Sequence, residues 1–163
     1  MKRRSRGPVS RTIERSDMDL ERAIEIATAA HRGQTDKAGQ PYILHPLRVM
    51  SACEGQAAQI VAVLHDVIED TDWTPDALRA EGASDAILAA LDAVTRRDDE
   101  TYSEFIERAA RNEIGRMVKI ADLRDNLDLS RIAQPTKADF ARMDRYRAAL
   151  QHLGSQLSEL ADD

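Results

Sequence analysis

The sequence predicts an all-α domain, and three features of its composition support that prediction. Its 163 residues include 25 Ala and 14 Leu, which are among the strongest helix formers, but only seven Gly and five Pro. Aromatic residues make up 4% of the chain, whereas strand-rich domains favour aromatic and β-branched side chains. Hydrophobic residues make up 42%, which is enough for a core and argues against global disorder. The length suits one domain, and no internal repeat is visible.

Helical periodicity, interrupted by capping residues, Gly and Pro, divides the chain into about seven or eight helices. Ser16 or Asp17 could cap the first helix, and Gly33 ends it. Thr74 and Pro75 begin a short helix, as a cap followed by proline in the first turn. We expect helices over residues 17–32, 46–54, 56–68, 75–81, 85–96, 103–111, 113–130 and 137–153. The third of these is largely apolar, so it is predicted to be central.

The charge is distributed unevenly along the chain. We expect a flexible basic arm over residues 1–15, one helical domain over 16–155 and a frayed tail over 156–163. Residues 1–16 hold six basic residues and one acid, a net charge of +5, and the remaining residues hold 17 basic and 28 acidic groups, a net charge of −11. Because nucleic-acid backbone is bound by clustered cations, a body this acidic is not expected to bind nucleic acid.

Simple counts exclude several other classes of protein. The single cysteine, Cys53, cannot form an internal disulfide, and Cys-rich zinc sites need several thiolates. No apolar run approaches the length of a membrane span, and no apolar segment follows the basic N-terminus as it would in a secretory signal. A reducing, cytoplasmic location is therefore expected. A homo-oligomer is left open.

An unusual group of polar residues, HDVIEDT (65–71), lies at the C-terminal end of the apolar third helix. Three carboxylates there, Asp66, Glu69 and Asp70, oppose the helix macrodipole, which favours cations at this end. A bound divalent cation would offset them. Adjacent residues on a helix differ by about 100°, so His65 and Asp66 could hold one ion from neighbouring faces. Such a ligand set suits Mn²⁺, Fe²⁺, Zn²⁺ or Mg²⁺ and argues against Ca²⁺.

Two further candidate ligands come from other segments. His45 belongs to PYILHP (41–46), which precedes a predicted helix start. Asp122 belongs to KIADLRDN (119–126), where its neighbours are apolar, and an aspartate in such a setting usually needs a partner. Each feature alone is common, but their joint occurrence in an all-α chain favours a metal site.

These motifs resemble those of HD-domain phosphohydrolases of the RelA/SpoT hydrolase group, whose small stand-alone members hydrolyse (p)ppGpp, the alarmone of the stringent response. The matching segments are HRGQTDKAGQPYILHP (31–46), VLHDVIEDT (63–71) and KIADLRDN (119–126). With the intervening helices, the resemblance covers about residues 17–153 and implies an HD-domain helical bundle. The synthetase domain of that group needs a further long C-terminal segment, so the chain length implies a hydrolase without a synthetase.

The resemblance also implies roles for individual residues. It implies that one Mn²⁺ is held by His45, His65, Asp66 and Asp122. It implies that Glu69 and Asp70 orient or activate the attacking water and handle protons.

Candidate substrate contacts come partly from the same resemblance. It implies that Asn126 contacts the substrate ribose and that Lys37 lies near the substrate. The basic face of the last predicted helix adds a pair drawn from the residues alone, Arg145 with Tyr146, as a candidate for phosphate contacts.

Two departures from the related motifs bear on the substrate. Asp36 stands where the related loop has an arginine that stacks on guanine, and Asp125 stands where KLADRxHN has a histidine. Three hypotheses follow. The first is a Mn²⁺-dependent hydrolase that removes the 3′-pyrophosphate of (p)ppGpp; the second is the same site acting on another nucleotide, a dinucleotide cofactor such as NADPH, or a phosphate monoester. The third is a metal- or nucleotide-binding module without turnover.

Overall fold

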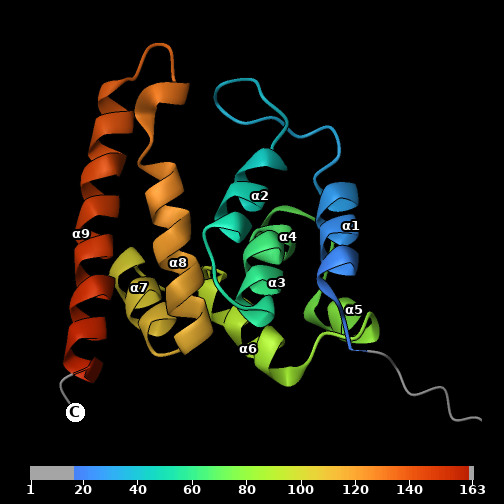
Figure 1. The fold of residues 1–163 in the computed structure, drawn as a ribbon. Coiled ribbons are helices and arrows are strands. Elements are labelled where there is room, and N and C mark those ends of the chain that lie inside the picture. The colour runs from blue at the N-terminus through green and yellow to red at the C-terminus, as the bar shows by residue number, and fades with distance from the viewer. Residues whose placement is uncertain (1–16, 162–163) are drawn as a thin grey trace, which may run out of the picture.

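The computed structural model describes the backbone of residues 17–161 and the side chains of residues 17–155. The predicted arm over residues 1–15 lies outside the described residues. The all-α prediction is confirmed, because the described residues form helices and no strand. The helices are α1 (Leu20–Ala30), α2 (Leu44–Ser51), α3 (Gln56–Leu64), α4 (Val67–Asp70), α5 (Pro75–Ala80), α6 (Asp85–Val94), α7 (Tyr102–Ala110), α8 (Glu113–Asn126), the 3₁₀ turn η1 (Leu129–Arg131) and α9 (Lys137–Ala161), shown in Figure 1.

The helix starts follow local capping chemistry. Thr74 caps α5 through its hydroxyl oxygen, as the sequence predicted, and Ser84 caps α6 in the same way. Thr101 and Glu104 form a capping box at the start of α7. The first helix begins later than predicted, because the cap is Asp19, whose carboxylate accepts the Arg22 N–H at 2.8 Å.

The helix predicted over residues 56–68 is interrupted at His65 and Asp66. His65 Nδ1 donates to the carbonyl of Ala62 at 2.6 Å. A continuous helix would pair that same carbonyl with the Asp66 N–H, so the histidine side chain competes with the helix ladder. The HD pair therefore lies at the junction of α3 and α4, with both residues in the right-handed helical region of backbone conformation.

The core is built around α3, as its apolar sequence predicted. Six of its nine residues are buried, and the helix packs against α1, α2, α6 and α8. A second cluster joins α7, α8 and α9 through Ile106, Ala110, Ile120, Leu123, Ala149 and Leu153. Because α8 contributes to both clusters, it links α3 to α9, and this packing fixes the rotation of the helix and so the direction of each KIADLRDN side chain.

Several connections gather at one end of the bundle (Figure 1). The loop between α1 and α2, the start of α2, the end of α8 and the start of α9 all meet there, and together they line a pocket. The helix predicted over 113–130 ends at Asn126, and Asp128 caps the following 3₁₀ turn. Helix α9 continues to Ala161, past the predicted end at residue 153. Every helix in the described part of the chain is too short or too polar to span a bilayer.

Candidate metal centre and substrate pocket

Three segments far apart in the sequence bring the four predicted metal ligands together. The three buried ligands are His45 in the first turn of α2, His65 at the end of α3 and Asp122 in the C-terminal half of α8. One ligand atom of each lies within 4.8 Å of the others. His45 Nε2 lies 3.1 Å from Asp122 Oδ1, and His65 Nε2 lies 3.5 Å from the same oxygen. Asp66 Oδ2 lies 3.0 Å from His65 Nε2 and 3.7 Å from His45 Nε2.

Each histidine is fixed through its other ring nitrogen. His45 Nδ1 is bonded to Asp125 Oδ2 at 2.7 Å, and His65 Nδ1 is bonded to the Ala62 carbonyl at 2.6 Å. Because the acceptors have no hydrogen to give, both Nδ1 atoms carry the shared proton, and in the neutral rings Nε2 keeps its lone pair. This is the arrangement of metal-ligating histidines, in which the outer hydrogen bond sets the tautomer.

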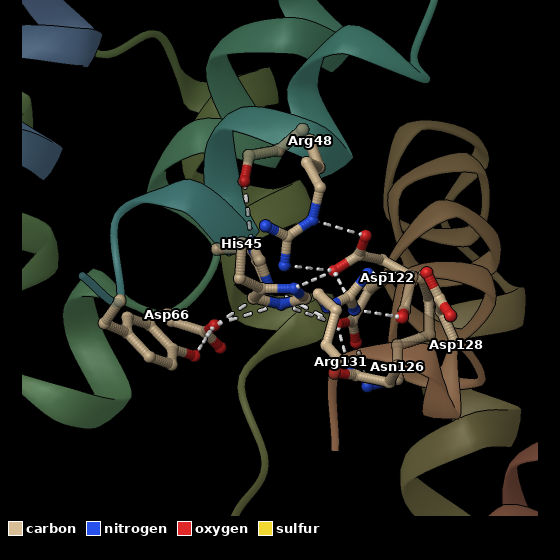
Figure 2. Close-up of polar contacts among 12 residues, drawn as sticks. His45, Arg48, Asp66, Asp122, Asn126, Asp128 and Arg131 are labelled. Carbon is tan, nitrogen blue, oxygen red and sulfur yellow. Dashed lines mark hydrogen bonds and ion pairs between the residues drawn. The ribbon is translucent and has the colours of Figure 1, made fainter. Parts of the chain in front are cut away.

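The two carboxylates of the cluster are also held by neighbours. Tyr42 donates its hydroxyl to Asp66 Oδ2 at 2.5 Å, and Figure 2 shows Asp66 on the opposite side of His45 from Arg131 and Asp128. Lys119 donates to Asp122 Oδ2 at 2.8 Å, and Asn126 donates to Asp122 Oδ1 at 2.8 Å. The side chains on α8 therefore orient Asp122 from one turn before and one turn after it.

Burial and the neighbouring charges shift the pKa values of the side chains in the cluster. Burial by itself raises the pKa of Asp122, but Lys119 and the two imidazoles hold that pKa well below its usual value. Burial also raises the pKa of Asp66, and the charge of His65 overrides it to give a pKa of about 2. Burial lowers the pKa of His65, whereas Asp66 and Asp122 raise it well above the ordinary value. The site thus favours ionised carboxylates beside positive charge.

The arrangement fits a divalent cation. His65 Nε2 is buried and has no hydrogen-bond partner among the described residues, which is an unfavourable state for a polar atom. Bonds of about 2.1 Å to a cation place neighbouring ligand atoms about 3 Å apart when the bonds meet at right angles. The separations of 3.0 to 3.7 Å between the nitrogen and oxygen atoms of the cluster are close to that spacing.

A pocket with a volume of about 460 Å³ opens from this cluster. It is lined by residues of four segments: Thr35, Asp36, Lys37, Ala38, Tyr42, His45, Arg48, Asp66, Lys119, Asp122, Asp125, Asn126, Asp128, Arg131, Ile132, Arg142, Met143 and Tyr146. Five of these side chains are cationic, and the same pocket holds five carboxylates. A bound divalent cation would therefore make the pocket net positive and suit an anionic substrate.

The structure brings three of the four predicted substrate residues to this pocket. Lys37, Asn126 and Tyr146 line it. Arg145 does not, because its side chain lines a separate cavity with Tyr102. One turn earlier on α9, Arg142 takes the place in the main pocket that the sequence had suggested for Arg145. The helix phase of α9, set by packing on α7 and α8, makes that difference.

Glu69 and Asp70 lie on α4, directly after the HD pair. Both are exposed and neither lines the pocket, yet the Asp70 N–H donates to the Asp66 carbonyl at 2.9 Å. Local burial of the carboxyl groups, and then the negative charge of Asp66, raise the pKa of both. Gln34 supports the end of this helix, since it donates to the Asp70 carbonyl and bonds His31.

The structure adds several candidate functional residues that the sequence did not indicate. Arg48 and Arg131, both labelled in Figure 2, line the pocket and pair with Asp125, and the half-buried Lys119 pairs with Asp122. Tyr42 and Lys119 belong to motifs that the sequence had singled out, so their positions beside the ligands were a usable signal. Arg48 and Arg131 carried no such signal, because isolated arginines on polar segments usually lie in solvent.

The sequence of the chain is similar to those of several known proteins. No protein-family model matches the sequence. The chain is 33% identical over 131 residues to a probable GTP pyrophosphokinase of Mycobacterium leprae, an alignment that covers 72% of this chain and 16% of that protein. It is 30% identical over 161 residues to the guanosine-3′,5′-bis(diphosphate) 3′-pyrophosphohydrolase of Haemophilus influenzae, covering 83% and 23%. The chain therefore spans less than a quarter of the length of these relatives.

A further relative and one solved structure extend the comparison. The bifunctional (p)ppGpp synthase/hydrolase SpoT of Escherichia coli is 30% identical over 164 residues, an alignment covering 86% of this chain and 23% of that protein. A structure described as a metazoan ortholog of SpoT that hydrolyses ppGpp has the same fold, with a TM-score of 0.69 at 23% identity over 94% of this chain and 88% of that one. Over most of its length the chain is therefore similar in sequence to proteins of the RelA/SpoT type, and it shares its helical fold with the solved structure.

Proposed function

We propose that residues 16–155 form a metal-dependent phosphohydrolase that acts on a phosphorylated nucleotide, with the 3′-pyrophosphate of (p)ppGpp as the preferred target. The observation that carries the proposal is the buried cluster of His45, His65 and Asp122, with Asp66 beside it, in a pocket lined by cationic side chains. The names of the relatives support the same reaction.

Mn²⁺ is the cation that we propose for His45, His65, Asp66 and Asp122. Two imidazoles and two carboxylates suit a borderline cation, and Fe²⁺, Zn²⁺ and Mg²⁺ are the alternatives to compare with it. Such a cation, when bound, lowers the pKa of water and offsets the negative charge that develops on phosphorus.

The chain itself supplies the proton acceptor. In the proposed hydrolysis, the oxygen of water forms a bond to phosphorus while the bond between that phosphorus and the ribose 3′-oxygen breaks. Glu69 or Asp70 accepts the proton that the water loses, and the 3′-oxygen gains a proton. The raised pKa values of both carboxyls bring them closer to the pH at which they work, which favours general base catalysis.

Substrate binding is proposed for four side chains of the pocket. Lys37 and Arg142, which both bind Asp139 Oδ1, offer positive charge to the phosphates, and Tyr146 lies one turn beyond Arg142 on α9. Asn126 lies one turn from Asp122, where its amide can reach a ribose hydroxyl beside the metal centre.

The test is a panel of nucleotides incubated with the protein and Mn²⁺, with the products identified by chromatography and mass spectrometry. We expect (p)ppGpp to yield pyrophosphate together with GDP or GTP. The variant His65→Ala should release no product, whereas His152→Ala, which alters a histidine that lines a separate cavity, should match the wild type. Binding of nucleotide with thermal stabilisation but no product would instead identify a non-catalytic module.

One observation favours a second candidate, the same reaction class on a different substrate. Asp36 places a carboxylate in the pocket, where its charge acts on Arg48, and its side chain accepts the N–H groups of Ala38 and Gln40. A carboxylate there is unfavourable for a substrate as anionic as (p)ppGpp. Faster release of phosphate from NADPH, another nucleotide or a phosphate monoester in the same panel would select this candidate.

A further inference from the structure

Asp125 holds the candidate metal ligand His45 from the side away from the cluster. Its Oδ2 accepts a hydrogen bond from His45 Nδ1 at 2.7 Å, while Nε2 of the same ring lies 3.1 Å from Asp122 Oδ1. An ionised carboxylate has no hydrogen to donate, so the bonded Nδ1 must carry the proton. In the neutral ring, Asp125 therefore directs the Nε2 lone pair toward the cluster.

His65 differs from His45 in this respect. Its Nδ1 is bonded to the Ala62 carbonyl, a backbone group three residues earlier on the same helix. No single side-chain substitution removes that acceptor. The orientation of His45 depends instead on one side chain, 80 residues away on α8.

The same carboxylate also holds two arginines of the pocket wall. Arg48 donates from Nε to Oδ1 at 2.8 Å and from a terminal nitrogen to Oδ2 at 3.1 Å, in a two-pronged contact. Arg131 donates to the Asp125 carbonyl at 2.7 Å and approaches Oδ2 at 3.3 Å. These guanidinium groups compensate the charge of a side chain that is only 12% exposed.

Helix geometry explains why Asp125 can contact both His45 and an arginine of the pocket wall. His45 and Arg48 are three residues apart on α2, and Asp122 and Asp125 are three residues apart on α8, so each pair shares a face. The two faces meet, since α2 packs against α8. Asp125 therefore joins the metal side of the pocket to the wall that Arg48 and Arg131 form. Figure 2 shows His45 near Arg48 and Arg131.

We propose that Asp125 is a positioning residue that sets the tautomer and orientation of His45 for cation binding and, with the same carboxylate, places Arg48 and Arg131 at the pocket wall. Asp125 acts through these groups and does not itself contact the cation. The proposal rests on the proposed metal site, but it does not require that any particular nucleotide be the substrate.

The first test compares Asp125→Asn with Asp128→Asn. Asp128 is a matched control because it also pairs with Arg131, at 2.9 Å, and also lines the pocket, but has no contact with His45. An amide at position 125 has one acceptor oxygen and no charge, so its NH₂ group must face a donor, either Nε of Arg48 or Nδ1 of His45. We expect Asp125→Asn to weaken Mn²⁺ binding, measured by calorimetry without substrate, by about 10-fold or more, and Asp128→Asn to stay within about two-fold of the wild type.

The second test needs only the wild-type protein. With Zn²⁺ as a diamagnetic probe, ¹⁵N–¹H correlation spectra of the histidine rings should show the His45 proton on Nδ1 and the metal on Nε2. This measurement decides the proposal even where Asp125→Asn does not fold.

The outcomes separate this proposal from the proposed function. A folded Asp125→Asn protein that binds Mn²⁺ as tightly as the wild type would overturn it, as would a His45 proton on Nε2 or a wild-type protein that binds no Mn²⁺. A wild-type protein that binds Mn²⁺ and loses affinity in Asp125→Asn, but hydrolyses no nucleotide, would fail the proposed function and leave the role of Asp125 intact.

Discussion

Lys37 and Asp139 form an ion pair at 3.2 Å between side chains 102 residues apart in the sequence. Asp139 Oδ1 also accepts a hydrogen bond from Arg142 at 2.6 Å, and its Oδ2 accepts the Thr136 N–H at the start of α9. One buried carboxylate thus gathers a cation from the loop before α2 and a cation from α9. Two cations held this close together favour a shared phosphate contact.

Loss of either cation should weaken substrate binding. We expect Lys37→Ala and Arg142→Ala each to raise KM by about 10-fold, since a hydrogen bond to a charged group contributes about 1.5–3 kcal/mol. Arg145→Ala is the matched control on the same helix, because its side chain lines a different cavity. Steady-state kinetics on the best substrate of the panel measure the difference, and an equal effect of Arg145→Ala would contradict the placement of the phosphates.

Removal of a residue that binds the metal directly should weaken Mn²⁺ binding more than removal of a residue that only orients a ligand. A residue that only orients a ligand is worth about 10–100-fold in metal affinity, so Asp122→Ala should weaken Mn²⁺ binding by more than about 100-fold. Calorimetry with Mn²⁺ measures this loss. Asp128→Ala, which removes a pocket carboxylate outside the cluster, should keep the affinity of the wild type. Wild-type affinity in Asp122→Ala would exclude the cluster as the metal site.

The carboxylates of α4 should affect the chemical step and spare the metal. We expect Glu69→Gln and Asp70→Asn to bind Mn²⁺ normally, and at least one of them to lower kcat by about 10²–10⁴-fold, the usual contribution of a general base. Asp72→Asn, two residues after Asp70 and also exposed, should leave kcat unchanged. If both variants kept full kcat, the proton would have to be accepted elsewhere.

Asp36 has a structural role and an electrostatic one, and two variants separate them. Asp36→Asn keeps an oxygen that can accept the N–H groups of Ala38 and Gln40, both at 2.9 Å, and removes a negative charge near Arg48. We expect this variant to lower KM for (p)ppGpp by about three-fold, a screened charge effect of about 0.6 kcal/mol. Asp36→Ala loses the loop bonds as well, so a lower KM in Asp36→Ala than in Asp36→Asn would show that the turn is unimportant.

Glu100 should make the stability of the protein depend on pH. The carboxylate accepts two hydrogen bonds from Arg108, at 2.6 and 3.0 Å, and ties down the connection between α6 and α7. Those bonds lower its pKa from 4.5 to about 2. Because the folded-state pKa lies below the unfolded value, the stabilisation is fully present above about pH 4.5 and is lost as the pH falls toward about 2.

Urea unfolding of Glu100→Gln tests this expectation. At pH 7 the variant should lose about 1 kcal/mol of unfolding free energy, the usual value of a charge-assisted hydrogen bond that is partly accessible to solvent. The difference from the wild type should shrink as the pH falls from 4.5 toward 2. Glu104→Gln, which keeps an amide oxygen able to accept the Thr101 N–H of the capping box, serves as the comparison. A difference that stays constant down to pH 2.5 would contradict the lowered pKa.

The role of Asp125 could not be predicted from the motif that contains it. From the sequence, Asp125 was a mismatch in an otherwise related motif, with no partner to explain it. The structure gives it three partners, His45, Arg48 and Arg131, from two other segments. Because His45 and Arg48 lie 80 and 77 residues away from Asp125 in the sequence, only the packing of α2 on α8 could show its role.

Local chemistry and periodicity determined a large part of this protein. The caps at Thr74, Ser84 and Thr101 and the apolar run of α3 act within one or two helical turns, so the sequence alone predicted these helices and the central position of α3. The motifs also contained His45, His65 and Asp122, the residues that meet in the buried cluster.

Tertiary structure decided what depends on contacts between distant segments. The choice of Arg142 over Arg145 for the pocket and the pairing of cations with Asp125 and Asp139 follow from how whole helices are oriented in the bundle. Side-chain direction on a helix changes by about 100° per residue, so a small difference in helix phase moves a charge from one pocket to another. That phase is set by burial of apolar surface along the entire helix, which no short motif encodes.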